Sequence, residues 1–217
     1  MTYAIEARDL YYTYEDGTVA LDHISFRAER GKMTGILGAN GAGKSTLFLN
    51  LNGVLTPAGG EVRVDGVPVT YDRKGLISVR KQVGIVFQDP DDQLFSADVY
   101  RDISFGGVNL GLPEEEVRRR VDEAMEWTGV THLKGKPTHA LSFGQKKRVA
   151  IAGVLVMEPS VVILDEPTAG LDPQGVSDIM RLLAELRGRL GMTIIIATHD
   201  MDIVPLYCDY AYLLNGG

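Results

Sequence analysis

The sequence predicts an α/β fold with a mostly parallel core sheet, and three observations lead to this prediction. Continuous apolar runs occur at residues 33–37, 161–164 and 193–197, and each has the length of a buried strand. An amphipathic helical pattern over residues 173–190 separates the last two runs. A glycine-rich loop follows the first run and leads into another helical pattern. Apolar strands that alternate with helices are typical of a parallel sheet covered on both faces.

The N-terminal part of the chain predicts a separate antiparallel β-subdomain. Residues 4–10, 24–28 and 61–64 show alternation or β-branched side chains, as half-buried strands do. Residues 15–17 (Glu-Asp-Gly) and 64–67 (Val-Asp-Gly-Val) have the composition of hairpin turns. Short strands joined by tight turns pair in the antiparallel sense.

The middle of the chain predicts a buried strand followed by a helical subdomain. The strand is an apolar run at residues 83–87, which leads directly into a polar segment. Residues 98–157 are mostly helical in pattern, and a helix that starts with proline and three glutamates covers residues 113–127. We therefore expect a helical subdomain over about residues 89–157.

We expect a single nucleotide-binding domain over residues 1–217. Residues 210–214 have the pattern of a strand, which enters a turn at residues 215–217 with no return strand. The sequence therefore predicts that a C-terminal region has been truncated or is absent. We find no internal repeat and no disordered linker in the pattern.

Composition restricts the partners and the compartment. A net charge of −7 argues against a sequence-independent nucleic-acid surface, so no nucleic-acid partner is expected. Basic residues cluster at 118–120 and 146–148 on expected helices, and we interpret both clusters as solvated faces. The one cysteine, Cys208, fits a reducing compartment and is expected to be partly buried. There is no signal peptide and no apolar run of about 18 residues, so the chain itself is not expected to span a membrane.

A phosphate-binding loop is predicted by the segment Gly38-Ala39-Asn40-Gly41-Ala42-Gly43-Lys44-Ser45. Glycines let successive backbone N–H groups turn toward a phosphate chain, and the following helix adds positive charge at its N-terminus. Lys44 would reach the β- and γ-phosphates of a nucleotide, and the Ser45 hydroxyl would ligate Mg²⁺. The residues expected to contact the nucleotide here are Asn40, Gly41, Gly43, Lys44, Ser45 and Thr46.

Two carboxylates follow the apolar run at residues 161–164. In open α/β sheets, ligands bind at the C-terminal ends of the strands, where Asp165 and Glu166 would lie. Asp165 would hold the Mg²⁺ shell, and Glu166 would polarise an attacking water. Combined with the phosphate loop, this pair predicts a site for phosphoryl transfer.

A third segment, Leu141-Ser142-Phe143-Gly144-Gln145, begins an expected helix. A serine and a backbone N–H at a helix N-terminus form an anion site. The segment resembles the signature motif of ATP-binding-cassette (ABC) ATPases, Leu-Ser-Gly-Gly-Gln, with Phe143 in place of the first glycine. The resemblance implies that Ser142, Gly144 and Gln145 close over ATP held by the phosphate loop of a second subunit.

Further marks of this family follow in order and imply three more site residues. Gln88 matches the glutamine of the Q-loop, which contacts Mg²⁺ and senses the membrane partner. Residues 169–172 (Ala-Gly-Leu-Asp) resemble the D-loop, in which Asp172 would contact the opposite subunit. His199 matches the switch histidine that positions the γ-phosphate and the water.

An aromatic residue after the first strand would stack on adenine, and we favour Tyr14 over Tyr11 and Tyr12. The resemblance covers essentially the whole chain. It implies a P-loop NTPase fold of the ABC type, ATP and Mg²⁺ as cofactors, and a dimer of identical or paralogous ATPase subunits. A P-loop kinase or a GTPase would lack the signature and the switch histidine.

Residues 87–96 narrow the subfamily. They resemble the extended Q-loop of energy-coupling-factor importers, and residues 71–76, 146–155 and 197–202 resemble the ATPase subunit of the cobalt/nickel type. The implied function is ATP hydrolysis that powers import, by a peripheral subunit on the cytoplasmic face of the cell membrane. Its implied partners are an integral membrane coupling subunit and a substrate-binding membrane subunit. The alternatives are the ATPase of a vitamin importer and a soluble ABC ATPase that acts on DNA or ribosomes.

Overall fold

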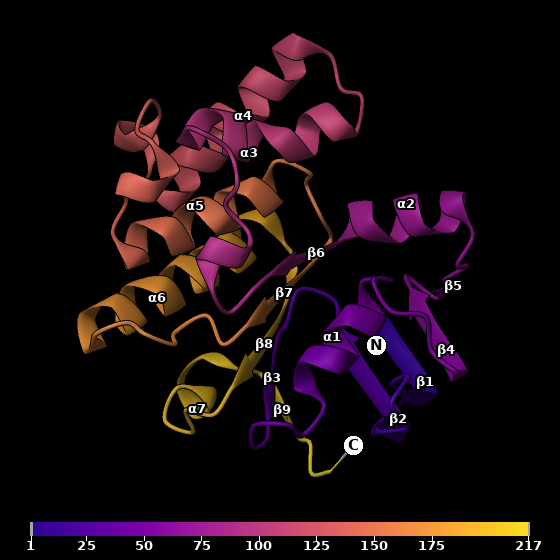
Figure 1. Cartoon of the computed structure of the whole chain (residues 1–217). Coiled ribbons are helices and arrows are strands. Elements are labelled where there is room, and N and C mark those ends of the chain that lie inside the picture. Colours follow the sequence, from indigo (N-terminus) through magenta and orange to yellow (C-terminus); the bar gives the residue numbers. More distant parts are fainter. Residues whose placement is uncertain (1, 217) are drawn as a thin grey trace.

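The computed structural model describes residues 2–216 and contains two β-sheets with helices packed on and between them (Figure 1). The first sheet is antiparallel, in the order β2-β1-β4-β5. Its strands are β1 (Tyr3–Thr13), β2 (Val19–Glu29), β4 (Gly59–Val64) and β5 (Val67–Pro68). Tight turns join β1 to β2 and β4 to β5, with Gly17 and Gly66 at φ angles of 85° and 77°. The predicted N-terminal antiparallel sheet is confirmed.

The second sheet is parallel, in the order β6-β7-β8-β3-β9. Its strands are β3 (Met33–Leu37), β6 (Val83–Val86), β7 (Val161–Asp165), β8 (Thr193–Thr198) and β9 (Tyr210–Leu213). The α/β fold class that the sequence predicts is therefore confirmed. Because all five strands run the same way, the C-terminal ends of β3, β7 and β8 meet at one edge of the sheet.

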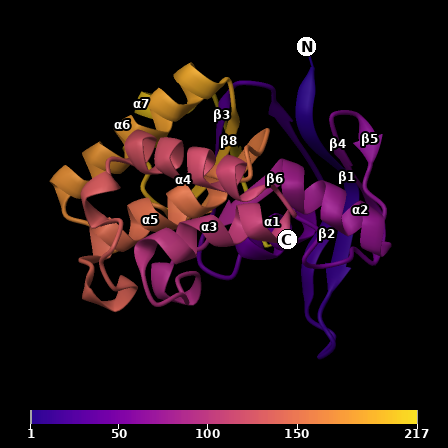
Figure 2. The same cartoon turned by 90° about the horizontal axis from the view of Figure 1, so that it is seen from above.

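Helices fall into three groups around the sheets (Figures 1 and 2). One group forms a helical layer, made of α3 (Val99–Asn109), α4 (Glu114–Thr128) and α5 (Phe143–Leu155). The second group covers the parallel sheet, with α1 (Lys44–Leu51) between the two sheets and α6 (Pro173–Leu190) on the other face. The remaining helices are α2 (Arg73–Gln82) and the single turn α7 (Val204–Tyr207), neither of which the sequence predicted. Over residues 2–216, no helix combines the length and apolarity needed to cross a membrane.

The parallel sheet separates two hydrophobic cores. On one face, Ile194 and Ile196 of β8 pack with buried residues of α3, α4, α5 and α6. On the other face, Ile195 and Ala197 pack with α1 and the antiparallel sheet. Side chains alternate along a strand, so this one strand contributes to both cores. The functional edge of the sheet is therefore fixed by packing from both sides.

Candidate active site

The phosphate loop connects β3 to α1 through residues 38–43. Gly41 and Gly43 have φ angles of 81° and 95°, in a region that residues with side chains rarely adopt. A Cβ on Gly43 would lie 2.5 Å from the carbonyl oxygen of Ala20, so this position accepts only glycine. The loop is therefore held in a tight curve at the N-terminus of α1, where the helix dipole favours an anion.

A cleft of about 400 Å³ opens beside this loop. It brings together ten of the predicted site residues, namely Tyr14, Asn40, Gly41, Gly43, Lys44, Ser45, Thr46, Gln88, Asp165 and Glu166. His199 does not line the cleft, and neither do the predicted residues of the signature and the D-loop, Ser142, Gly144, Gln145 and Asp172. The chain thus presents two separate groups of predicted site residues.

Lys44 is buried in the loop that precedes it. Its Nζ donates hydrogen bonds to the carbonyl oxygens of Gly38 at 2.7 Å and Ala39 at 3.1 Å. The same Nζ lies 3.8 Å from Oε1 of Glu166. A cation with three donors is therefore held at the floor of the cleft, between the loop and a buried carboxylate.

Ser45 and Asp165 join the phosphate loop to the end of β7. Oγ of Ser45 donates a hydrogen bond of 2.5 Å to Oδ2 of Asp165. Burial raises the pKa of the Asp165 carboxyl, the hydrogen bond from Ser45 opposes this, and the neighbouring Glu166 charge adds to it. Hydroxyl, carboxylate and amide oxygens from Ser45, Asp165 and Gln88 are the hard ligands that Mg²⁺ prefers, so the residues present fit that ion.

Glu166 is buried, and the structure shows no hydrogen bond to one of its carboxylate oxygens. Its Oε2 lies 2.8 Å from Nδ1 of His199, which follows β8. Its Oε1 has no hydrogen-bond partner among the residues described. The backbone of Glu166 has a φ of 45°, which is unusual for a residue with a long side chain. A buried carboxylate oxygen without a donor is costly, so a water or ligand proton is its natural partner.

Among the three tyrosines considered for adenine stacking, the cleft contains Tyr14. Its hydroxyl lies 2.8 Å from Oγ1 of Thr46, and its ring is exposed. Tyr12 meets Tyr14 edge-on, and Tyr11 packs against His23 instead. Stacking of adenine on Tyr14 stays a prediction, and the position of its ring favours it over the other two.

The signature residues lie at the exposed N-terminus of α5. Oγ of Ser142 accepts a hydrogen bond from the Gln145 N–H, and Oε1 of Gln145 accepts one from the Ser142 N–H, which forms a capping box. Asp172 caps α6 by accepting a bond of 2.7 Å from the Gly175 N–H. Both helix starts therefore have a clear structural role, and their predicted contacts with nucleotide require a second subunit.

One interpretation from the sequence is wrong. Residues 146–148 were expected on a solvated face, yet Lys147 is only 2% exposed. Burial lowers the pKa of its amine to about 8. The negative charges of Asp89, Glu166 and Asp165 act in the opposite direction and raise this pKa. A signal existed in the sequence, because Lys147 shares helical spacing with Ala150 and Ile151, which are buried. Lys146, in contrast, pairs with the exposed Asp91.

Gln93 is a second residue whose role the sequence reasoning missed. Its Oε1 accepts a bond of 3.1 Å from the Phe87 N–H, and its Nε2 donates one of 3.2 Å to the Ala150 carbonyl oxygen. It thereby ties the segment after β6 to α5. Nothing in the local sequence predicts the hydrogen bond between Gln93 and Ala150, because these residues are 57 positions apart.

A curved glycine loop with a buried lysine, a serine–aspartate pair and a carboxylate with a free oxygen together define a P-loop nucleoside triphosphatase. The comparisons with known proteins are more specific. The family model for ABC transporters matches residues 21–169. This span is more than half of the chain.

Relatives and solved structures agree with this match. The energy-coupling factor transporter ATP-binding protein EcfA2 of Clostridium perfringens is 62% identical over 215 residues, which cover 99% of this chain and 75% of the relative. EcfA of Methanocaldococcus jannaschii is 56% identical, with 99% and 77% covered. The structure of CbiO1 from Clostridium perfringens has a TM-score of 0.91 at 62% identity and covers 99% of this chain and 85% of that one.

A more distant structure bears on the chemistry. It is a dimeric ATP-binding cassette in a post-hydrolysis state, bound to ADP and Pi, with a TM-score of 0.86 and 26% identity over 97% of this chain and 94% of that one. The chain belongs to the ABC transporter ATPase family, and it is an ATPase.

Proposed function

We propose that the chain is the ATP-hydrolysing subunit of an energy-coupling-factor importer for cobalt or nickel ions. The observation that carries the importer assignment is an apolar groove beside the Q-loop, separate from the nucleotide cleft. Two similar proteins support it. EcfA2 is an energy-coupling factor transporter protein, and CbiO1 is described as part of the ABC transporter complex cbiONQ.

Residues in and beside the cleft would bind ATP and carry out its hydrolysis. The Lys44 ammonium would bind the β- and γ-phosphates of ATP. Oε1 of Glu166, which has no hydrogen-bond partner among the described residues, would accept a proton from the attacking water, while His199 holds the other oxygen in place. Mg²⁺, held by Ser45, Asp165 and Gln88, would supply positive charge against the phosphate oxygens. Tyr14 would orient the adenine.

The two separate groups of site residues favour a head-to-tail dimer. Ser142, Gly144 and Gln145 present a helix N-terminus away from the cleft of their own chain, as does Asp172 at the start of α6. In a dimer of identical or paralogous subunits, each signature would close over the ATP of the other. A dimeric bacterial ABC transporter cassette has a TM-score of 0.87 to this chain at 27% identity, with 98% of this chain and 95% of that one covered.

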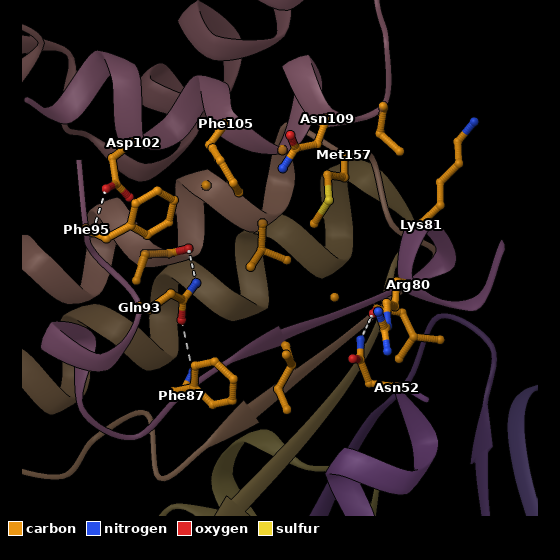
Figure 3. Close-up of a pocket in the computed structure, with 18 of the residues that line it drawn as sticks. Asn52, Arg80, Lys81, Phe87, Gln93, Phe95, Asp102, Phe105, Asn109 and Met157 are labelled. Carbon is orange, nitrogen blue, oxygen red and sulfur yellow. Dashed lines mark hydrogen bonds between the residues drawn. The ribbon is translucent and has the colours of Figure 1, made fainter. Parts of the chain in front are cut away.

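The groove has a volume of about 370 Å³ and is lined by residues of α2, β6, α3 and α5 (Figure 3). At one end the rings of Phe95 and Phe105 meet edge-to-face at 4.7 Å, and both are exposed. Gln93, which holds the segment after β6, lies in the same groove (Figure 3). An apolar groove of this kind fits an amphipathic helix. We assign it to the integral membrane coupling subunit, which would work with a substrate-binding membrane subunit and place this chain peripherally on the cytoplasmic face.

The test is purification from the native cell with and without a groove variant. Wild-type chain, tagged and solubilised gently from membranes, is expected to bring down an integral membrane partner. Phe105→Glu should lose that partner and keep basal ATP hydrolysis, because a charge in an apolar groove is costly to desolvate. Val108→Glu is the matched control, since Val108 lies on the same helix, is exposed and does not line the groove. Recovery with ribosomes or DNA and no membrane protein would overturn the importer assignment.

Cargo is tested on the same purified complex. Elemental analysis by mass spectrometry is expected to find cobalt or nickel bound to the substrate-binding membrane subunit. A bound vitamin in place of a metal would refute the cobalt/nickel assignment and would support the vitamin-importer alternative. In either case the ATPase assignment would stand.

A further inference from the structure

Lys147 is a buried charge, and its ammonium donates hydrogen bonds to residues outside its own helix. Its Nζ donates to the carbonyl oxygen of Gln88 at 2.9 Å and to that of Glu166 at 3.2 Å. The ring of Phe143, one turn earlier on α5, covers the ammonium at 5.3 Å from the ring centroid. A buried amine is retained when its donors meet acceptors, and here the two acceptors belong to separate segments of the nucleotide site.

The Glu166 carbonyl belongs to a backbone that needs support. Glu166 has a φ of 45°, and a non-glycine residue in this region is held there by its surroundings. Backbone hydrogen bonds at this residue run from the Glu166 N–H to Ala197 and from the Ala169 N–H to Glu166. In the part of the chain that the structure describes, Lys147 is the one side chain bonded to the Glu166 backbone.

The other carbonyl belongs to Gln88, in a segment that α5 also holds elsewhere. Gln93 connects the Phe87 N–H to the Ala150 carbonyl oxygen, three residues after Lys147 on the same helix (Figure 3). One helix face therefore fixes both ends of the segment from residue 87 to residue 93. Lys147 lies on α5, which begins at the signature residues. A displacement of this helix would therefore act on the Glu166 carbonyl through the Lys147 hydrogen bond.

We propose that Lys147 is a positioning residue for ATP hydrolysis, which sets the backbone of Glu166 against that of Gln88 and couples both to the signature helix. The inference rests on the roles proposed above for Glu166 and Gln88. Lys147 touches no reacting atom. It acts by holding the carboxylate of Glu166 where its free oxygen faces the cleft, and displacements of about 1 Å at such a group cost about 100-fold in rate.

The test compares three variants of the intact chain. Lys147→Met keeps the volume and removes the donors, Lys147→Arg keeps a cation with several donors, and Lys146→Met is the control for loss of a neighbouring lysine on the same helix. For each variant we would measure kcat and KM for ATP, the affinity for a non-hydrolysable ATP analogue by calorimetry, and amide hydrogen exchange over residues 87–93 and 165–169. Should Lys147→Met fail to fold, Lys147→Gln replaces it in the same measurements.

Lys147→Met is expected to lower kcat by about 10- to 100-fold, as misplacement of a catalytic group does, with little change in analogue affinity. Exchange should become faster in both segments, and Lys147→Arg should recover most of kcat. Lys146→Met should keep the wild-type kcat, analogue affinity and exchange over residues 165–169, because its ion pair is with Asp91 in the other segment. An unchanged kcat for Lys147→Met, or a parallel loss of kcat and analogue affinity, would overturn the inference. If Glu166→Gln still hydrolyses ATP, the proposed role of Glu166 fails first, and this inference fails with it.

Discussion

His199 Nδ1 lies 2.8 Å from Glu166 Oε2, and this contact joins an exposed side chain to a buried one. The histidine follows β8 and the glutamate follows β7, so the contact joins the C-terminal ends of two adjacent parallel strands. It occupies one carboxylate oxygen, and the other has no hydrogen-bond partner within residues 2–216. The histidine is thus placed to fix the orientation of the carboxylate, although it does not itself line the cleft.

Replacing the carboxylate tests this arrangement. Glu166→Gln is expected to lower the rate of ATP hydrolysis by about 100-fold or more, because an amide cannot accept the water proton. ATP should still bind, and light scattering with ATP and Mg²⁺ should show a closed dimer. Glu185→Gln, at an exposed carboxylate on α6, is the control and should behave as the wild-type chain. A variant that stays monomeric with ATP would contradict the composite site.

Removing the cation of the phosphate loop should weaken binding itself. Lys44→Ala is expected to reduce nucleotide affinity by about 10- to 100-fold, the usual loss for hydrogen bonds to a charged group. Calorimetric titration with an ATP analogue measures this directly. Lys32→Ala removes a partly exposed lysine just before β3 and serves as the control. Unchanged affinity in Lys44→Ala would remove the phosphate loop from the proposed site.

A contact between the signature and the D-loop makes a prediction about stability. Gly170 has a φ of 76°, and a Cβ there would lie 3.0 Å from Cε1 of Phe143. Gly170→Ala should therefore lower the free energy of unfolding by about 1–3 kcal/mol, through backbone strain and the aromatic contact together. Gly111→Ala isolates the strain, since Gly111 has a φ of 69° and no heavy atom lies within 4 Å of its added Cβ.

The double variant separates the two causes. If the ring of Phe143 contributes, Phe143→Ala should reduce the cost of Gly170→Ala to that of Gly111→Ala, as measured by denaturant unfolding. Equal costs in the presence and absence of the Phe143 ring would show that only backbone strain acts at Gly170.

Cys208 should be slow to react in the folded protein. Burial raises the pKa of its thiol to about 11; Asp209 adds to the shift and Arg187 opposes it. At pH 8 only about one thiol in a thousand would be ionised, against a far larger fraction in the unfolded chain. Alkylation by iodoacetamide at pH 8 should therefore be much slower without denaturant than with it. Because the folded pKa lies above the unfolded one, stability is full at lower pH and declines as the pH rises from about 9 to about 11.

The sequence predicted those parts of the site whose residues follow one another along the chain. The glycines, Lys44 and Ser45 of the phosphate loop follow one another, and Asp165 and Glu166 end a continuous apolar strand. Helix α2 escaped prediction because its apolar face is short, with Val79 as its one buried residue. Lys147 was misjudged because a charged residue in a basic cluster usually lies in solvent, whereas this one satisfies two distant carbonyls.

Other features depend on tertiary structure that no local pattern specifies. The positive φ of Glu166 and the contact of Phe143 with Gly170 arise only when β7, the D-loop and α5 are assembled. The sequence favoured Tyr14 over its neighbours, but the contact of its hydroxyl with Thr46 depends on the fold. The order of residues thus predicted the groups that would bind and react. It did not predict the tertiary contacts that hold those groups in place.

The alternation along β8 has a mechanical consequence. A slip of this strand by one residue would put Ile196 where Ala197 packs and Thr193 where Ile194 packs, so one core would be overfilled and the other would take in a hydroxyl group. The central strands therefore cannot transmit force by sliding past one another. A power stroke would have to run through rotation of whole layers about their connecting segments, with the sheet as the fixed frame against which they turn.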